Sequence, residues 1–219
     1  MVDYTFTAGD NNKLIMHGNF AQGSILVNIP EEDPSRLEYI SFFIHKSSIE
    51  FGIDCLHCIS LDNHQIINKA LFLSALTSLI KCFQKSNKYI LLYENQFRKV
   101  IPPHTFLEYE RFKDLRNKHY IHEENNMTEA TAFLFVSPEG SDTVMGGLPS
   151  VVFTKAELDI ISESKKLEEV MQEAWKFVAN SIDKIGDHFL QKYGKESRER
   201  LLSYGSPQFK LAQPDNINK

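Results

Sequence analysis

The residues best suited to chemistry form one dense polar run that begins at Arg116 and ends at Glu123. At about 100° per residue, an α-helix places four members of this run within a sector of about 120°. These four are Arg116, His119, His122 and Glu123. A guanidinium stabilises charge on phosphoryl oxygens, and an imidazole titrates close enough to neutral pH to move a proton. The run therefore contains the groups that general acid–base chemistry on a phosphodiester requires.

The stretch from Asp114 to His122 resembles the signature of the HEPN superfamily, which has an arginine, a polar residue, several variable residues and a histidine late in a bundle helix. It is most similar to the abortive-infection-like branch, whose motif reads Leu-Arg-Asn/Asp-Lys, three variable residues and His. Four residues match that motif: Arg116, Asn117, Lys118 and His122. Ile121 stands where that branch often has Ala, and the helical context of the resemblance begins near Arg36.

The resemblance implies a helical bundle that pairs as a homodimer and brings two copies of the motif together in a shallow cleft. In active members of the superfamily this cleft is a metal-independent RNA endonuclease that uses the ribose 2′-hydroxyl as nucleophile. Arg116 would hold the scissile phosphate, His122 would be the acid or base, and Asn117 would orient them. The binding residues expected around this centre are Lys118, His119 and Glu123. Such a protein could be the toxic half of a defence or toxin–antitoxin system, restrained by an antitoxin or another regulatory protein.

Other interpretations of the same run stay open. Many members of the superfamily bind a nucleotide or a partner protein and cut nothing. Arg116 could instead pair with Asp114 or Glu123, and His122 could close the helix end, where the macrodipole favours a cation. His119, His122 and Glu123 could ligate a metal, but no further ligand is identifiable, so we expect neither a metal nor a cofactor.

The overall charge argues against a protein that holds nucleic acid mainly by neutralising phosphates. The 219 residues carry 24 Lys and Arg against 29 Asp and Glu, a net charge of −5. The stretch from Asn95 to Glu124 contains six basic and five acidic residues, so its net charge is close to zero. The motif therefore does not lie in a strongly positive region that would attract nucleic acid. Contact with RNA would therefore be local. The composition, 42% hydrophobic and 24% charged, is typical of a globular protein.

Cysteine content and the N-terminal residues predict a cytoplasmic protein. The three cysteines are too few for a secreted disulfide framework. The N-terminal residues MVDYTFTAGDNNKL do not form a signal peptide, and we expect no membrane contact because no long uninterrupted apolar segment occurs. Cys55 and Cys58 are spaced as a Cys-x-x-Cys pair, but we expect both to be buried inside an amphipathic helix rather than reactive.

Apolar periodicity and capping signatures predict four long helices. Each begins near a capping pair spaced by three residues. The pairs are Ser35 and Glu38, Asp62 and Gln65, Thr105 and Glu108, and Thr154 and Glu157. The first three helices should end near Ile59, Ser86 and His122, and the fourth carries an apolar stripe over 167–189. The segment 88–103 fits either a short helix or an extended connection.

Short β-like runs flank the helices. They predict one hairpin near 13–29 and another near 131–154, between the third and fourth helices. The fold class is therefore mainly α, a helical bundle of four to five helices with small β-hairpin appendages, and the resemblance of the motif implies that this bundle is HEPN-like. We expect a single domain over 1–200, followed by a flexible tail over 201–219.

Overall fold

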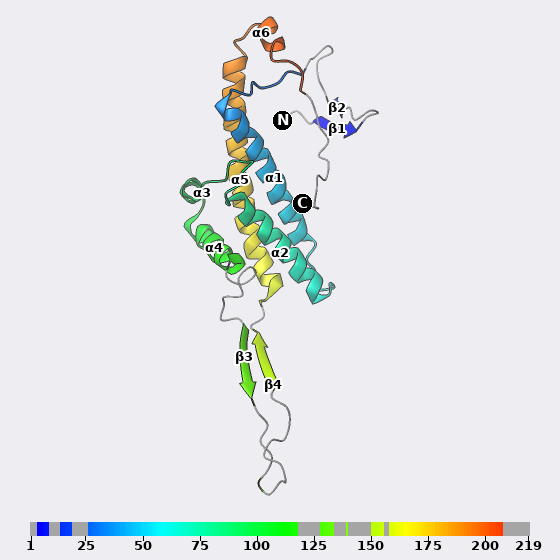
Figure 1. The fold of residues 1–219 in the computed structure, drawn as a ribbon, viewed down its shortest axis with the longest axis vertical. Helices are drawn as coiled ribbons and strands as arrows, with labels where there is room; N and C mark the ends of the chain where they lie inside the picture. Colours follow the sequence, from blue (N-terminus) through cyan, green and yellow to red (C-terminus); the bar gives the residue numbers. More distant parts are fainter. Residues whose placement is uncertain are drawn as a thin grey trace. The chain divides into compact units, whose positions relative to one another are not determined.

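The computed structural model describes seven parts of the chain, and these are mainly helical, as the sequence predicts (Figure 1). They are residues 4–8, 14–18, 26–117, 128–133, 139, 150–155 and 158–207. The helices are α1 (Pro34–His57), α2 (Gln65–Cys82), α3 (Glu94–Val100), α4 (Pro103–Asp114), α5 (Ile160–Tyr193) and α6 (Arg198–Leu202). The segment 88–103, which fitted two alternatives, thus contains the short helix α3.

The strands form two separate antiparallel pairs, β1 (Tyr4–Ala8) with β2 (Leu14–Gly18) and β3 (Thr128–Phe133) with β4 (Ser150–Lys155). The first pair differs from the hairpin predicted near 13–29. β2 pairs with the upstream strand β1, and residues 26–30 form no strand. The second pair overlaps the segment 131–154, where the other hairpin was predicted.

The chain divides into two compact units, although the sequence predicted a single domain over 1–200. The larger unit comprises Glu38–Lys184 and holds most of α1 and α5 together with α2, α3, α4, β3 and β4. The smaller unit comprises Met1–Leu37 and Ile185–Lys219. Arg116 and Asn117, the two predicted site residues that the structure describes, fall in the larger unit.

The core of the larger unit lies where α1, α2 and α5 meet. Gly52 of α1 marks the closest approach: a Cβ there would overlap the Cε of Met171 and lie 3.3 Å from the Cα of Ala75. Side chains with at most 1% exposure surround this point: Ile49, Phe72, Ala75, Leu76, Leu79, Ile80, Leu167, Val170, Met171 and Ala174. Because α2 contributes half of them, it is the central helix, as its largely apolar surface predicts.

An aromatic cluster packs α3 and α4 onto this core. The rings of Phe83 and Tyr109 lie 4.8 Å apart, and those of Phe97 and Tyr109 lie 5.6 Å apart. Phe106 stacks at 5.6 Å on Tyr109, and Phe112 packs at 6.2 Å from Phe72 of α2. All these rings are buried, so α4 is held firmly along one face.

The extended segment before α3 is hydrogen-bonded to α1 through the backbone of Ile90. The Oγ of Ser41 accepts a hydrogen bond from Ile90 N at 3.0 Å, and the Nε2 of His45 lies 2.7 Å from Ile90 O. Burial lowers the pKa of His45, so the ring is neutral at pH 7 and donates through Nε2. Two buried side chains thus fix the path from α2 to α3.

In the smaller unit, the segment before α1 contacts the turn after α6. The backbone N–H of Asn28 donates to Gly205 O at 2.9 Å, and its side-chain amide donates to Tyr204 O and Ser206 O. Gly205 has a φ of 73°, the left-handed conformation that favours glycine. Residues 201–206 are therefore hydrogen-bonded rather than part of a flexible tail, and 208–219 lie outside the described residues.

The first three long helices, α1, α2 and α4, begin within three residues of their predicted starts, whereas the fourth, α5, begins at Ile160, six residues after the predicted cap Thr154. Different residues occupy the cap position in all four. Asp33, His64 and Asp159 accept the backbone N–H bonds at the starts of α1, α2 and α5. Pro102 precedes α4 without a side-chain cap, and Thr154, one of the predicted caps, lies in β4. The predicted capping pairs are therefore wrong, because a nearby Asp, His or Pro takes the position instead.

Candidate active site

The end of α4 differs from the helix that the sequence predicted. The α-helix stops at Asp114, and a wider π-helical turn follows over Leu115–Asn117. The helix was expected to continue to about His122, and the shared face of the motif assumed 100° per residue throughout. That assumption is wrong across the π-helical turn, because each residue there rotates by a smaller angle.

Arg116 lies in this turn, half-buried, and its two hydrogen bonds to other described residues go to neutral acceptors. Its Nη1 donates to Asn117 Oδ1 at 3.0 Å, and its Nη2 donates to Gln84 Oε1 at 3.4 Å. Within residues 26–117 and the other described parts, Arg116 forms no ion pair. The guanidinium is thus positioned by two amides while its positive charge remains available to an anion.

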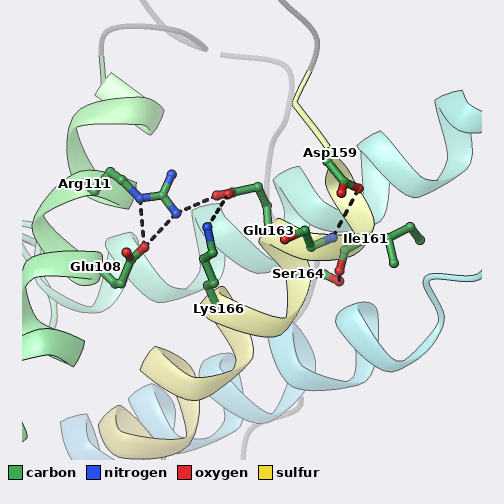
Figure 2. A network of polar contacts seen from close by, with 8 residues as sticks. Glu108, Arg111, Asp159, Ile161, Glu163, Ser164 and Lys166 are labelled. Carbon is green, nitrogen blue, oxygen red and sulfur yellow. Dashed lines mark hydrogen bonds and ion pairs between the residues drawn. The ribbon is translucent and has the colours of Figure 1, made fainter.

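Arg111, in the last turn of α4, contacts carboxylates rather than the neutral amides that surround Arg116 (Figure 2). Its Nη2 lies 2.5 Å from Glu163 Oε2, and its Nε donates to Glu108 Oε2 at 2.8 Å. Lys166 binds the other oxygen of Glu163 at 3.0 Å. Burial raises the pKa of Glu163, but Arg111 and Lys166 outweigh it and lower the pKa below its usual value. This network ties α4 to the start of α5.

Lys113 is also neutralised by a carboxylate. Its Nζ lies 2.5 Å from Oε1 of Glu94, which also accepts a hydrogen bond from the Tyr109 hydroxyl at 2.9 Å. Burial raises the pKa of Tyr109, and the adjacent Glu94 raises it further, so the phenol stays protonated. Among the cations described between 103 and 117, Arg116 alone has no carboxylate partner.

The structure brings together two of the six predicted site residues, Arg116 and Asn117. The others, Lys118, His119, His122 and Glu123, lie outside the described residues. The metal interpretation also rests on residues outside that part. Within the described parts of the chain, no three His, Cys, Asp or Glu side chains gather as a metal would require.

Sequence reasoning missed Gln84, the second acceptor of Arg116. Gln84 follows the end of α2 and lies 32 positions before Arg116 in the chain. A glutamine after a helix carries no signal in the sequence, because its role depends on how α2 and α4 pack. The aromatic contact between Phe72 and Phe112 brings these two helices together.

No family model, curated protein or solved structure matches this chain. Among the helices that the structure describes, none is long and apolar enough to cross a membrane. What the protein does must therefore be inferred from the chemistry of its own residues.

Proposed function

We propose that the protein is a metal-independent RNA endonuclease of HEPN type. The observation that carries the proposal is the state of Arg116, whose guanidinium is held by the amides of Asn117 and Gln84 without a described carboxylate partner. A phosphate with its two anionic oxygens is the natural ligand for such a group. The match of Arg116, Asn117, Lys118 and His122 to the HEPN motif supports the same function.

In the proposed reaction, the ribose 2′-oxygen attacks the phosphorus atom and the bond between phosphorus and the 5′-oxygen breaks. The 2′-hydroxyl loses its proton to a base, and an acid gives a proton to the departing 5′-oxygen. The products are a 2′,3′-cyclic phosphate and a 5′-hydroxyl end. Arg116 stabilises the charge on the non-bridging oxygens, Asn117 orients Arg116, and His122 transfers the proton.

The proposal includes a homodimer, because one motif supplies a single catalytic histidine and the reaction needs both an acid and a base. Two copies of His122 could share these roles across a cleft. Lys118, His119 and Glu123 would line that cleft and bind RNA. An enzyme that cuts cellular RNA in the cytoplasm needs restraint, so an antitoxin or regulatory protein is the expected partner.

A second candidate function is a binding module that holds a nucleotide and cuts nothing. It is favoured by the neutralisation of Arg111 and Lys113, which leaves little free positive charge along α4. A long RNA gains affinity from many phosphate contacts, whereas a nucleotide needs only a few. A single available arginine therefore suits a small phosphate ligand as well as a scissile phosphate.

The test is incubation of the purified protein with total cellular RNA in EDTA, followed by chemical analysis of the cut ends. The proposal predicts 2′,3′-cyclic phosphates and 5′-hydroxyls, with cleavage lost in both Arg116→Ala and His122→Ala. Arg98→Ala is the matched control, because Arg98 is an exposed arginine on α3 that lies 5.3 Å from the Phe106 ring and forms no ion pair with the described residues. It should cleave at the wild-type rate.

Isothermal titration with ADP separates the two candidate functions. A folded wild-type protein that cuts no RNA, yet binds ADP through Arg116, would support the binding module and contradict the nuclease. Cleavage that persists in Arg116→Ala, or that stops when EDTA is added, would also contradict the proposed mechanism.

A further inference from the structure

A second site lies in the larger unit, in a groove between α1 and α5 with a volume of about 310 Å³. Three residues of α1 and three of α5 line it: Glu50, Ile53, Asp54, Gln172, Trp175 and Lys176. On each helix the three positions follow an i, i+3, i+4 pattern, so they share one face. The volume is at the lower end of the range for small-molecule sites.

Polar contacts between the helices hold both ends of the groove. At one end, Trp175 Nε1 donates to Glu50 Oε1 at 3.0 Å. At the other end, His57 Nε2 lies 2.9 Å from Glu168 Oε1, and the amide of Gln172 donates to the same oxygen at 3.1 Å. The contacts from Trp175 to Glu50 and from His57 to Glu168 join α5 to α1, and their order along the two helices shows that the helices run antiparallel here. Both contacts hold the walls of the groove in place before any ligand binds.

One of the two acidic side chains that line the groove has no partner among the residues that the structure describes. Burial raises the pKa of Glu50, but Lys46, at 2.6 Å, and the Trp175 indole outweigh it and lower the pKa, so Glu50 is ionised and already paired. Lys176 is paired with Glu173 at 2.7 Å. The exposed carboxylate of Asp54 forms no hydrogen bond or ion pair with the described residues. It is therefore the charge that a ligand would neutralise.

We propose that this groove binds a small organic cation. The ammonium or guanidinium group pairs with Asp54, and the apolar body of the ligand packs against Ile53 and the half-buried indole of Trp175. The Nζ of Lys46 lies 5.4 Å from the centre of the Trp175 ring, so the protein's own ammonium already lies near this indole, and the ligand's cationic group pairs with Asp54 instead. The site is independent of Arg116 and of the nuclease proposal.

The sequence contains a single tryptophan, so the intrinsic fluorescence of Trp175 reports on this groove alone. We would titrate the full-length protein with phenethylammonium, which joins an aromatic ring to a primary ammonium, and with 2-phenylethanol, its neutral counterpart. The proposal predicts a saturable fluorescence change with phenethylammonium. The neutral compound should bind about fivefold more weakly, because it cannot pair with Asp54.

Two variants test the assigned charge. Asp54→Asn should weaken phenethylammonium binding about fivefold. Asp183→Asn is the matched control, because Asp183 is an exposed aspartate on α5 outside the groove, and it should bind as the wild type does. Far-ultraviolet circular dichroism confirms that each variant is folded. The absence of a saturable change, equal binding of the two compounds, or equal weakening by both substitutions would overturn the proposal.

Discussion

Arg111, in the last turn of α4, and Arg116, in the π-helical turn that follows α4, lie five positions apart, yet their surroundings differ in kind. Arg111 contacts the carboxylates of Glu108 and Glu163, whereas Arg116 contacts the amides of Asn117 and Gln84. When carboxylates surround a guanidinium, they compensate its positive charge, so it joins two helices but attracts an anionic ligand only weakly. When neutral amides hold a guanidinium, its positive charge is not compensated and can attract an anion. The partners of an arginine, rather than its presence, thus distinguish a structural role from a binding role.

The largest expected effect comes from Arg111→Ala, which removes the main partner of Glu163. The Glu163 residue is 8% exposed, so its carboxylate would stay buried with only Lys166 beside it. We expect a loss of about 2 kcal/mol in the free energy of unfolding, measured by urea denaturation, because the Arg111 side chain is 38% exposed and solvent weakens its ion pair with the buried Glu163. A loss below about 1 kcal/mol would show that the network in Figure 2 does not stabilise the fold.

The next effect is expected from Asn117→Asp, which gives Arg116 a carboxylate partner of the same size. The new carboxylate would neutralise the guanidinium and make Arg116 resemble Arg111. RNA cleavage should fall about tenfold with little change in stability. Asn95→Asp, on the exposed surface of α3, adds the same charge elsewhere and should leave the rate unchanged. Equal activity of Asn117→Asp and the wild type would contradict the proposed role of Arg116.

Acidification should narrow the stability difference between the wild type and Arg111→Ala. In the wild type the lowered pKa of Glu163 adds stability that is complete above about pH 4.3, the usual value of a free glutamate. This stability is lost as the pH falls through the lower pKa of the folded state. The Arg111→Ala variant lacks most of this pH-dependent stability, because Arg111 no longer lowers the pKa of Glu163.

Urea midpoints measured between pH 7 and pH 3 test this prediction. The two proteins should converge toward the acid end of the range. A stability difference that stays constant throughout would show that the charge of Glu163 does not cause it.

The smallest effect on stability is expected from Arg116→Ala. Its hydrogen bond to Gln84 is exposed and long, at 3.4 Å, and Asn117 remains solvated when the guanidinium is removed. We expect a loss of no more than about 0.5 kcal/mol in the free energy of unfolding. A loss as large as that of Arg111→Ala would make Arg116 a structural residue and remove the contrast between the two arginines.

The helices could be predicted from the sequence, but their exact ends could not. Apolar periodicity placed α1, α2 and α5, because each has a face that must be buried. The caps of α1 and α5 differed because Asp33 and Asp159 accept the backbone N–H bonds of Ser35 and Ser162, whereas the predicted cap Ser35 is itself the donor and Thr154 lies in β4. Which acceptor is used depends on the path of the preceding segment, and local residue types do not specify that path.

The site could be predicted only where its contacts are local. The hydrogen bond from Arg116 to Asn117 joins neighbours in sequence, and the motif indicated both residues. The partners Gln84 and Glu163 lie 32 and 52 positions from the arginines that they bind. Such contacts follow from helix packing. The π-helical turn over 115–117 likewise has no signature in residue type, so the predicted common face of the motif rested on the wrong rotation per residue.

The most direct test of the central claim is the single-turnover cleavage rate of an RNA oligonucleotide in EDTA, measured for the wild type, Arg116→Ala and Arg116→Lys. If Arg116 holds the scissile phosphate, Arg116→Ala should be at least about 100-fold slower, and Arg116→Lys should recover part of the rate because it restores the charge. The wild-type products should end in 2′,3′-cyclic phosphates. Cleavage by Arg116→Ala at the wild-type rate, or wild-type products ending in 3′-hydroxyls, would contradict the account.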